Sequence, residues 1–316
     1  MTKVALLASQ NGLGHSRRLF HLLIGLQHFG FDCTLFLGMK QFRLLTSEFD
    51  FSILGTKSRV IHPMKLDGPH IPIENFGISE KFEDLVERES IVISDNIVLN
   101  DSHHFPYYLH GHFNWLEYER IELLSKGSEE SSECKFGELQ TWFALKDFKL
   151  PSDIGKSITL DLPFICYGSN WHSKAQVNAN LVWVSKGITN DFHEDKLDSL
   201  TKLFPNVEFV LRESWKLKKS SVLPALILGR PGMGTIRDCL EVGVPFIPFG
   251  SDFDIELESN SKNLLRVGLR NECGGVVEEV TQVLEGSGIE ERYLSYWVKN
   301  SLSIGEYASL VAKVIV

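Results

Sequence analysis

The sequence predicts an α/β protein made of two consecutive doubly wound domains. The first observation is the apolar run "VALLA", after which come a glycine-rich turn, a leucine-rich segment and a second apolar run, "CTLFL". Buried parallel strands read as unbroken apolar runs, and the helices between them carry apolar residues at helical spacing. The second observation is that this alternation returns from "NLVWVS" to "VPFIPF". A chain of 316 residues is long enough for two such domains.

The first half begins with a predicted βαβ unit. Leu19, Leu22, Leu23 and Leu26 recur at helical spacing and predict a helix that ends at Gly30. Strands are expected on either side of it, at 3–9 and 31–38. Further along we expect a buried strand at 90–96, a helix at 115–127, an acidic, serine-rich loop at 126–133 and the crossing between domains within 150–178.

The second half repeats the pattern with a different turn chemistry. Expected strands are 180–185, 206–211, 224–228 and 244–249, and expected helices are 193–204, 236–243 and 257–267. The segment 292–316 is expected to be helical. The glycine-rich stretch "GRPGMGT", at 229–235, connects the third of these strands to its helix.

Composition excludes several classes of function. The formal net charge is −9 at pH 7, which does not suit non-specific binding to nucleic acid or anionic lipid, because such binding needs clustered Lys and Arg. The five scattered cysteines include no CxxC pair and indicate reduced thiols. The N-terminal apolar run is too short for a signal peptide, and no stretch approaches the ~18 apolar residues of a membrane span. We expect a cytoplasmic protein without a transmembrane segment.

The turn after the first strand, "QNGLGHSRR", concentrates polar chemistry. Gly12 and Gly14 permit a tight turn and close approach of a ligand, and the following helix start offers backbone N–H groups to an anion. The pattern is not GxGxxG, because Arg17 stands where the third glycine would be. His15 either serves as a general base or caps the helix at the surface.

Other polar residues near this turn have two interpretations each. Asp95 ends a predicted strand, and ligands of open α/β sheets bind beyond the carboxyl ends of strands. It either takes part in a ligand site at that edge or caps the next turn. Arg17 and Arg18 either meet an anionic acceptor or cover the surface of the helix.

The second turn, after the strand that ends at Gly229, is suited to a phosphate. Gly232 and Gly234 open the turn, and Thr235 follows near the helix start, so backbone amides and a hydroxyl face the same point. Asp238 lies about one helical turn further on, where a carboxylate can accept hydrogen bonds from ribose hydroxyls. The alternative is a structural turn with a solvated Asp238.

A histidine cluster in "DSHHFPYYLHGHFNW" raises a zinc hypothesis. Its members are His103, His104, His110 and His112. No carboxylate or Cys stands beside them at zinc-finger spacing, so we expect loop and strand residues, with no metal site. Trp297 and Tyr307, in the C-terminal segment, are expected in the core.

The second turn resembles the C-terminal signature of GT-B glycosyltransferases, which handle nucleotide sugars. The matching residues are Gly232, Thr235, Asp238, "GVP" at 243–245, Pro248, Asn260 and Gly268. "GRPGMGTIRD" is similar to the N-acetylglucosaminyltransferase that completes the lipid-linked peptidoglycan precursor, and more distantly to plant secondary-product glucosyltransferases. The residues Gly12, Gly14, His15 and Arg18 also resemble the UDP-sugar hydrolase of pseudaminic acid synthesis.

The resemblance implies two Rossmann-like domains that face each other across a cleft. Their expected boundaries are 1–160 for the acceptor side and 161–290 for the nucleotide-sugar side, with a helical segment at 291–316 that returns to the first domain. The nucleotide-binding residues it implies are Gly187, Thr189, Arg230, Gly232, Met233, Gly234, Thr235 and Asp238. Glu256 and Asn260 take the place of residues that hold the donor sugar, and Gly12, Gly14 and Arg18 lie on the acceptor side. Asp238 stands where the family has a Glu.

The activity implied is transfer of a sugar from a nucleotide diphosphate sugar, most simply a UDP-sugar, to a hydroxyl acceptor. His15 would take the proton from the acceptor hydroxyl, and Asp95 would orient the His15 ring. The anomeric centre would invert, and neither a metal nor a cofactor is expected. Water as the acceptor gives a nucleotide-sugar hydrolase instead, and the same fold also serves nucleotide-sugar 2-epimerases. A scaffold that only binds sugar nucleotides is the non-enzyme alternative.

Overall fold

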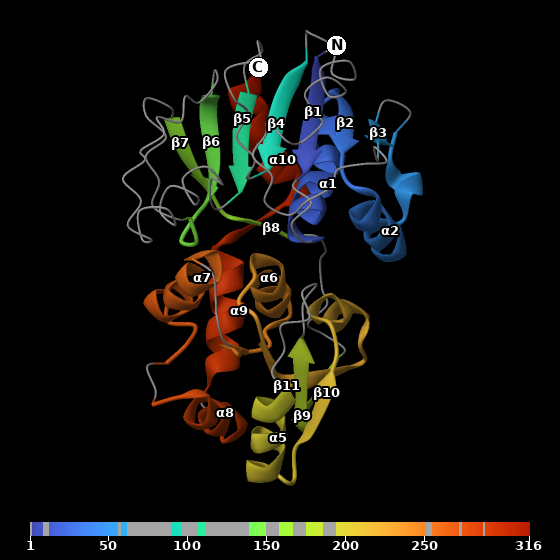
Figure 1. Cartoon of the computed structure of the whole chain (residues 1–316). Helices are drawn as coiled ribbons and strands as arrows, with labels where there is room; N and C mark the ends of the chain where they lie inside the picture. The colour runs from blue at the N-terminus through green and yellow to red at the C-terminus, as the bar shows by residue number, and fades with distance from the viewer. Residues whose placement is uncertain are drawn as a thin grey trace, which may run out of the picture. The chain divides into compact units, whose positions relative to one another are not determined.

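A computed structural model of the chain describes residues 2–8, 13–55, 58–61, 90–95, 107–111, 139–149, 158–166, 175–185, 194–250, 255–271, 274–286 and 288–316. The chain divides into two compact units (Figure 1). Unit 1 consists of Met1–Tyr167 and Leu302–Val316, and unit 2 consists of Gly168–Ser301. The helix expected at 115–127 and the loop expected at 126–133 lie outside the described residues.

Unit 1 is built on a parallel sheet whose described strands follow the order β3-β2-β1-β4-β5-β6-β7. The strands are β1 (Lys3–Ala8), β2 (Asp32–Phe36), β3 (Ser58–Ile61), β4 (Ile91–Asp95), β5 (Tyr107–Gly111), β6 (Leu139–Leu145) and β7 (Ile158–Leu162). The chain moves outward from β1 to β3 and then returns to β4 on the other side of β1. In open α/β sheets, ligands bind beyond the carboxyl ends of the strands at such a reversal.

The described helices of unit 1 pack on the sheet and on one another around one apolar core. They include α1 (Leu13–His28), α2 (Met39–Glu48), the short 3-10 helix η1 (Phe51–Ile53) and α10 (Ile304–Ile315). The leucines that predict α1 are all buried, and they belong to one core cluster with the apolar side chains of β1 and β2. The predicted βαβ start of the chain is therefore present in the structure.

Helix α10 packs directly on α1, and the two lie side by side in Figure 1. The contact is too close for a side chain on α1 at Gly25, because a Cβ atom there would lie 2.4 Å from Cβ of Ala308. Ala308, Val311 and Ile315 of α10 are buried in the core cluster of unit 1. The last described helix of the chain thus completes the core that begins with the first strand.

The expectation of one helical segment over 292–316 is wrong in one respect. Two helices, α9 (Ile289–Lys299) and α10, are separated by the short strand β13 (Ser301–Ser303), which pairs with β8 (Phe164–Cys166). Ser303 caps α10: its hydroxyl accepts from the backbone N–H of Glu306, while the Glu306 carboxylate accepts from the backbone N–H of Ser303. A new N-cap requires non-helical backbone at that residue, so the helix cannot run through it.

Unit 2 contains a second parallel sheet, with the order β10-β9-β11-β12. Its strands are β9 (Gln176–Ser185), β10 (Glu208–Leu211), β11 (Val222–Gly229) and β12 (Phe246–Pro248). Its described helices are α5 (Glu194–Leu203), the 3-10 helix η4 (Ser214–Lys219), α6 (Met233–Val242), α7 (Ile255–Arg266), α8 (Val276–Leu284) and α9. The strand order reverses between β9 and β11, which marks their carboxyl ends as the expected ligand edge.

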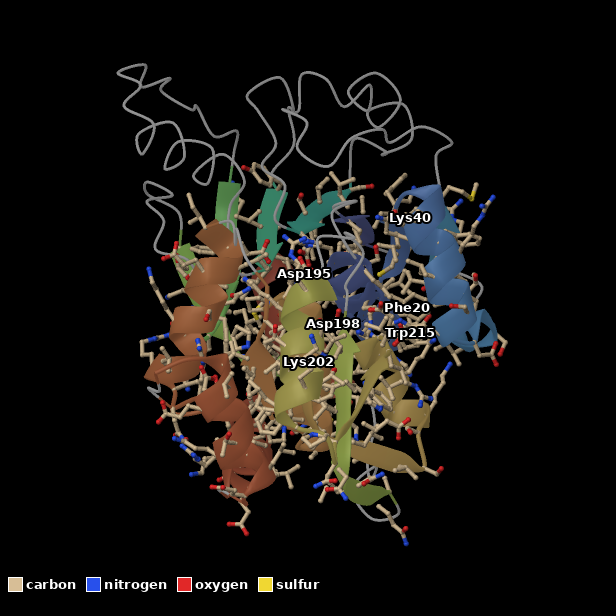
Figure 2. All side chains as sticks on the ribbon, turned by 60° about the horizontal axis from the view of Figure 1, so that its bottom comes forward. Phe20, Lys40, Asp195, Asp198, Lys202 and Trp215 are labelled. Carbon is tan, nitrogen blue, oxygen red and sulfur yellow. The ribbon has the colours of Figure 1, made fainter. Side chains whose placement is uncertain are left out.

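Two helices show how unit 2 combines burial and exposure. On α5, the charged residues Asp195, Asp198 and Lys202 lie one after another along the exposed side (Figure 2), while Leu200 faces the core. On α9, Tyr293 is fully buried, and its hydroxyl bonds to the backbone N–H and C=O of Phe246 at 3.0 and 3.1 Å. That pair of hydrogen bonds ties α9 to β12. Within the described residues, no helix is both long and apolar enough to cross a membrane.

Candidate active site

The polar residues of unit 1 meet at the point where its strand order reverses. Asp95 is the last residue of β4, where it pairs in register with Ala8 of β1 on one side and with His110 of β5 on the other. His15 and Arg18 lie in the first turns of α1, which follows β1. Because these strands are parallel, their carboxyl ends share one edge, and the side chains there gather around Asp95.

The carboxylate of Asp95 is fully buried and receives four short contacts from nitrogen atoms. His15 Nδ1 lies 2.7 Å and Arg18 Nη2 2.7 Å from Oδ1. Arg18 Nε lies 3.0 Å and His110 Nδ1 3.0 Å from Oδ2. A carboxylate has about four lone-pair sites, two on each oxygen, so this arrangement saturates it.

Asp95 is held in its charged form. Burial alone would raise the pKa of this carboxyl group, but the Arg18 charge and the hydrogen bonds from His110 and His15 keep the pKa well below its ordinary value. An ionised carboxylate only accepts hydrogen bonds, so the nitrogen that faces it must carry a proton in both histidines. We therefore assign the Nδ1–H form to both rings. The neutral ring of His15 then carries its lone pair on Nε2, where an imidazole can take up a proton.

With this tautomer, one close contact in the cluster is not a hydrogen bond. Arg18 Nη2 lies 3.1 Å from His15 Nδ1. With Nδ1 protonated, both atoms are donors, and no hydrogen bond can join them. They approach each other because both bond to the same oxygen, Oδ1 of Asp95.

Sequence reasoning missed the role of His110 in this cluster. Its Nε2 lies 2.7 Å from the hydroxyl oxygen of Tyr307, on α10. Both residues are buried, as expected for strand and core residues, but they also extend the hydrogen-bond network of Asp95. The signal was present in the sequence: "YYLH" ends an apolar run with a polar residue, just as "IVISD" does.

The two arginines of the first turn have different surroundings. Arg17 is buried and forms a 2.8 Å ion pair with Glu48 of α2, so it neither covers the helix surface nor lies open to an acceptor. Arg18 keeps a partly exposed side chain while it bonds Asp95. Gly14 lies in the first turn of α1, and Gly12 is outside the described residues.

The corresponding edge of unit 2 lies at the ends of β9 and β11. Gly229 and Ser185 are paired in register there, and a Cβ on Gly229 would lie 2.7 Å from the carbonyl oxygen of Ser185. Only glycine fits this position without movement of the backbone. Gly187 and Thr189, which come next after β9, lie outside the described residues.

Helix α6 starts at this edge with a row of backbone donors. Gly232 is its N-cap, and Met233, Gly234 and Thr235 form its first turn, where the N–H groups have no partner within the helix. Together with the helix dipole, these groups favour an anion. Arg230 adds a positive charge just before the turn.

A side chain of α7 braces that turn. Asn260 is buried and donates from Nδ2 to the carbonyl oxygen of Pro231 at 2.9 Å. Its Oδ1 is buried, and within the described residues it has no hydrogen-bond partner. Glu256 lies about one turn earlier on the same helix and is partly buried. The structure therefore brings Asn260 to the α6 turn, with Glu256 on the adjoining turn of α7.

Asp238 lies on the inner side of α6 and is 1% exposed. Ser214 of η4 donates to its Oδ2 at 3.1 Å. A second link joins the same two elements, because Lys218 of η4 forms a 2.6 Å ion pair with Glu241 of α6. Asp238 is thus a buried, hydrogen-bonded carboxylate rather than a solvated one.

Comparison with solved structures identifies the architecture. The Arabidopsis thaliana UGT89C1 complexed with UDP-L-rhamnose is 12% identical with a TM-score of 0.64, and the match covers 100% of this chain and 99% of that one. The spinosyn forosaminyltransferase SpnP is 12% identical with a TM-score of 0.63 and 99% coverage of both chains. Phytolacca americana UGT2, complexed with UDP-2-fluoro-glucose and pterostilbene, is 15% identical with a TM-score of 0.60, over 99% of this chain and 98% of that one.

The chain has the GT-B fold. The fold predicted from the sequence is thereby confirmed. No protein-family model and no curated protein sequence matches the chain. The closer likeness to the peptidoglycan-precursor transferase and to the pseudaminic-pathway hydrolase stays a prediction.

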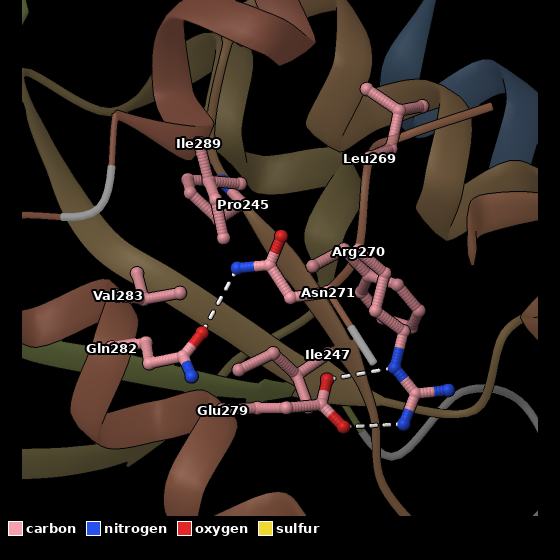
Figure 3. A pocket seen from close by; sticks show the side chains of 10 residues that line it. Pro245, Ile247, Leu269, Arg270, Asn271, Glu279, Gln282, Val283 and Ile289 are labelled. Atoms are coloured by element: carbon pink, nitrogen blue, oxygen red, sulfur yellow. Dashed lines mark hydrogen bonds and ion pairs between the residues drawn. The ribbon is translucent and has the colours of Figure 1, made fainter. Parts of the chain in front are cut away.

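Unit 2 of this GT-B chain also contains a pocket at the amino end of β12, between α8 and α9 (Figure 3). Its polar side chains bond each other: Arg270 donates to both carboxylate oxygens of Glu279, and Asn271 donates to Gln282 at 2.9 Å. The α6 turn begins instead after the carboxyl end of β11. The pocket therefore belongs to the packing of α8 on the sheet.

Metal ligands do not gather in the described part of the chain, which contains no group of three or more His, Cys, Asp or Glu residues able to hold an ion. Of the histidine cluster in the sequence, His110 bonds Asp95 and Tyr307. His103, His104 and His112 lie outside the described residues.

Proposed function

We propose that this GT-B protein is a glycosyltransferase that moves a sugar from a nucleotide diphosphate sugar, of which a UDP-sugar is the first choice, to a hydroxyl acceptor. The observation that carries the proposal is the buried bond between Asp95 Oδ1 and His15 Nδ1, 2.7 Å long, at the strand reversal of unit 1. A histidine held in this tautomer next to a carboxylate is suited to general-base catalysis.

His15 is the proposed base. It takes the proton from the acceptor hydroxyl at Nε2 while that oxygen attacks the anomeric carbon of the donor. Asp95 holds the ring in the required tautomer and stabilises the imidazolium that forms. Attack on the face opposite the leaving group inverts the anomeric centre. Gly12, Gly14 and Arg18 form the acceptor side of this proposal.

Unit 2 is the proposed donor side. The nucleoside diphosphate lies at the start of α6, where the amides of Met233, Gly234 and Thr235 and the charge of Arg230 stabilise the leaving diphosphate without a metal ion. Asp238 holds the ribose, and Glu256 and Asn260 hold the sugar. The proposed nucleotide-binding residues also include Gly187, Gly232 and Thr189. The buried acceptor oxygen Oδ1 of Asn260 supports this assignment, because such a group needs a donor.

The nature of the donor is inferred from the solved structures of similar fold. Two of them are complexes with UDP-L-rhamnose and with UDP-2-fluoro-glucose. In this proposal both units take part in the transfer: unit 1 supplies the base, and unit 2 binds the donor. We propose no nucleic acid partner, in agreement with the net charge of −9.

The first test is a thermal-shift panel of UDP, GDP, CMP and dTDP and their sugars. A ligand that binds only the folded state at about 100 times its Kd raises the free energy of unfolding by about 2.7 kcal/mol. We expect a selective shift from one nucleotide class, and we expect Asp238→Asn to reduce it. The absence of any shift would contradict the proposal. It would indicate a protein that has kept the GT-B fold but lost the sugar-nucleotide chemistry.

The second test separates catalysis from donor binding. His15→Gln should abolish sugar transfer while it keeps the nucleotide shift, because His15 acts on the acceptor proton. The matched control is His28→Gln at the other end of α1, where the exposed ring bonds the carbonyl oxygen of Ile24 at 2.6 Å. Release of free sugar in the absence of an acceptor, faster than transfer to any acceptor, would instead indicate the hydrolase.

A further inference from the structure

The Asp95 carboxylate is held from two sides, and only one of them includes the proposed base. Helix α1 supplies His15 and Arg18, and strand β5 supplies His110. We propose that His110 and Tyr307 are positioning residues for the His15–Asp95 pair. In this proposal Tyr307 holds the His110 ring, and His110 fixes Oδ2 of Asp95 so that Oδ1 faces His15. The inference rests on the function proposed above.

The chemistry of the ring nitrogens leads to this assignment. Asp95 is an anion that only accepts, so Nδ1 of His110, 3.0 Å from Oδ2, must carry the proton. In this proposal the His110 ring is neutral, and its Nε2 carries no proton and accepts a hydrogen bond. The hydroxyl of Tyr307 lies 2.7 Å from it and donates. Tyr307 donates to His110, and His110 donates to Asp95, so the three fix each other's orientation.

Because both side chains are buried, these hydrogen bonds are needed to satisfy their polar atoms. His110 is 2% exposed and Tyr307 4% exposed, so water cannot replace a lost partner without movement of the protein. Removal of the Tyr307 hydroxyl leaves a buried acceptor on His110 unsatisfied, which costs far more than an exposed bond would. A rotation of the ring would relieve this cost, but it would withdraw Nδ1 from Asp95.

Helix α10 fixes the position of the Tyr307 hydroxyl. Its backbone is close to that of α1 at Gly25 and Ala308, and Tyr307 is the neighbour of Ala308. The same core cluster contains Tyr307, Ala308 and Val311. The position of the hydroxyl is therefore fixed by the close packing of two helices.

The test compares two tyrosines that lose only a hydroxyl. Tyr307→Phe removes the donor to His110, whereas Tyr293→Phe, in unit 2, removes an equally buried hydroxyl that bonds the backbone of Phe246. In the full-length protein with 15N-labelled histidine, NMR should show both His15 and His110 as Nδ1–H tautomers. Tyr307→Phe should speed the exchange of the His110 Nδ1 proton and shift the His15 signals, and Tyr293→Phe should change neither.

Kinetics supply the second readout. Tyr307→Phe should lower kcat about tenfold, the scale of one hydrogen bond within a charged network, and leave the donor KM unchanged. His110→Asn, which keeps a donor for Asp95, should retain more activity than His110→Phe, which keeps an aromatic ring. Unchanged His15 signals in Tyr307→Phe would overturn the inference, as would a kcat equal to that of Tyr293→Phe or an Asn variant no better than the Phe variant.

The NMR readout needs no substrate, so the two proposals can fail separately. A wild-type protein that transfers no sugar from any nucleotide contradicts the proposed function, whatever the His15 signals do. A wild-type protein that transfers sugar, with a Tyr307→Phe variant that leaves those signals and kcat unchanged, contradicts only the positioning role.

Discussion

Asp95 and His110 occupy paired positions on the neighbouring parallel strands β4 and β5, and Oδ2 of Asp95 lies 3.0 Å from Nδ1 of His110. Paired residues of adjacent strands project their side chains to the same face of a sheet. The carboxylate is thus supported from within the sheet as well as from α1. This dual support underlies the first two predictions.

Asp95→Asn should reduce sugar transfer strongly with little change in volume. The amide cannot accept four hydrogen bonds and donates from one side, so it no longer holds His15 with Nδ1 protonated. We expect kcat to fall about a hundredfold to ten-thousandfold, the range for loss of a working general base. The matched control is Asp161→Asn on β7, where an exposed carboxylate pairs with Lys149 at 2.6 Å. Equal losses of kcat in the two variants would refute the assignment.

Asp95 should also make the folded state sensitive to acid. Its folded-state pKa lies well below the ordinary value of about 3.9, so at low pH the unfolded chain binds a proton that the folded chain does not. The stabilisation is complete above that ordinary value and declines as the pH falls toward the folded-state pKa. Urea unfolding from about pH 6 to about pH 3 should show a smaller decline for Asp95→Asn than for the wild type. Parallel curves would show that other groups dominate.

The contact between α1 and α10 should not tolerate a methyl group. In an exposed helix, replacement of Gly by Ala stabilises by up to about 1 kcal/mol, and Gly305→Ala in α10, with no heavy atom within 4 Å of the new Cβ, should do so. Gly25→Ala should instead destabilise by about 1–3 kcal/mol, because the new Cβ would overlap Ala308. Chemical denaturation measures both. A stabilising Gly25→Ala would mean that α10 shifts freely.

Ser214→Ala should lower both the stability of the protein and its affinity for the nucleotide, because Ser214 bonds Asp238. The serine hydroxyl bonds a buried carboxylate, so its loss should cost about 1–3 kcal/mol of stability and also weaken nucleotide binding. Ser199→Ala removes a similar bond, to the carbonyl oxygen of Asp195, on the exposed side of α5. It should change stability by no more than about 0.5 kcal/mol. Thermal shifts with and without nucleotide separate the two effects, and unaltered nucleotide affinity in Ser214→Ala would contradict this role.

The sequence predicts the βαβ start of unit 1 and the alternating strands and helices of unit 2 because the signals for these elements are local. The leucines of α1 and the apolar runs of β1 and β11 fix period and burial within short windows. The strand β13 escaped prediction because "SLS" is too short for a period, and its partner β8 is remote in the sequence. What ends α9 and restarts the chain as α10 is the capping residue Ser303, a single-residue signal within a helical pattern.

The sequence predicts those residues of the candidate site that stand at strand ends and in turns. His15 and Asp95 follow apolar runs, and the rule for parallel sheets brings them to one edge. Tyr307 could not be found this way, since it bonds a histidine 197 residues away and its own surroundings read as core. Arg17 likewise needed the position of α2, because its partner Glu48 is unrelated to the turn motif.

The two units are made of different segments of the chain, and this affects the order in which they can form during synthesis. Unit 2 is one continuous stretch, Gly168–Ser301, whereas unit 1 is interrupted and needs Leu302–Val316 to fill its core. The ribosome delivers the chain from the N-terminus, so unit 1 must wait for α10, whereas unit 2 already has all its described strands by then. Until Tyr307 has emerged and docked, the His110 ring lacks the hydroxyl that bonds its Nε2. The network around Asp95 is therefore complete only after residues 302–316 have been made, when the described strands of both sheets are already present in the chain.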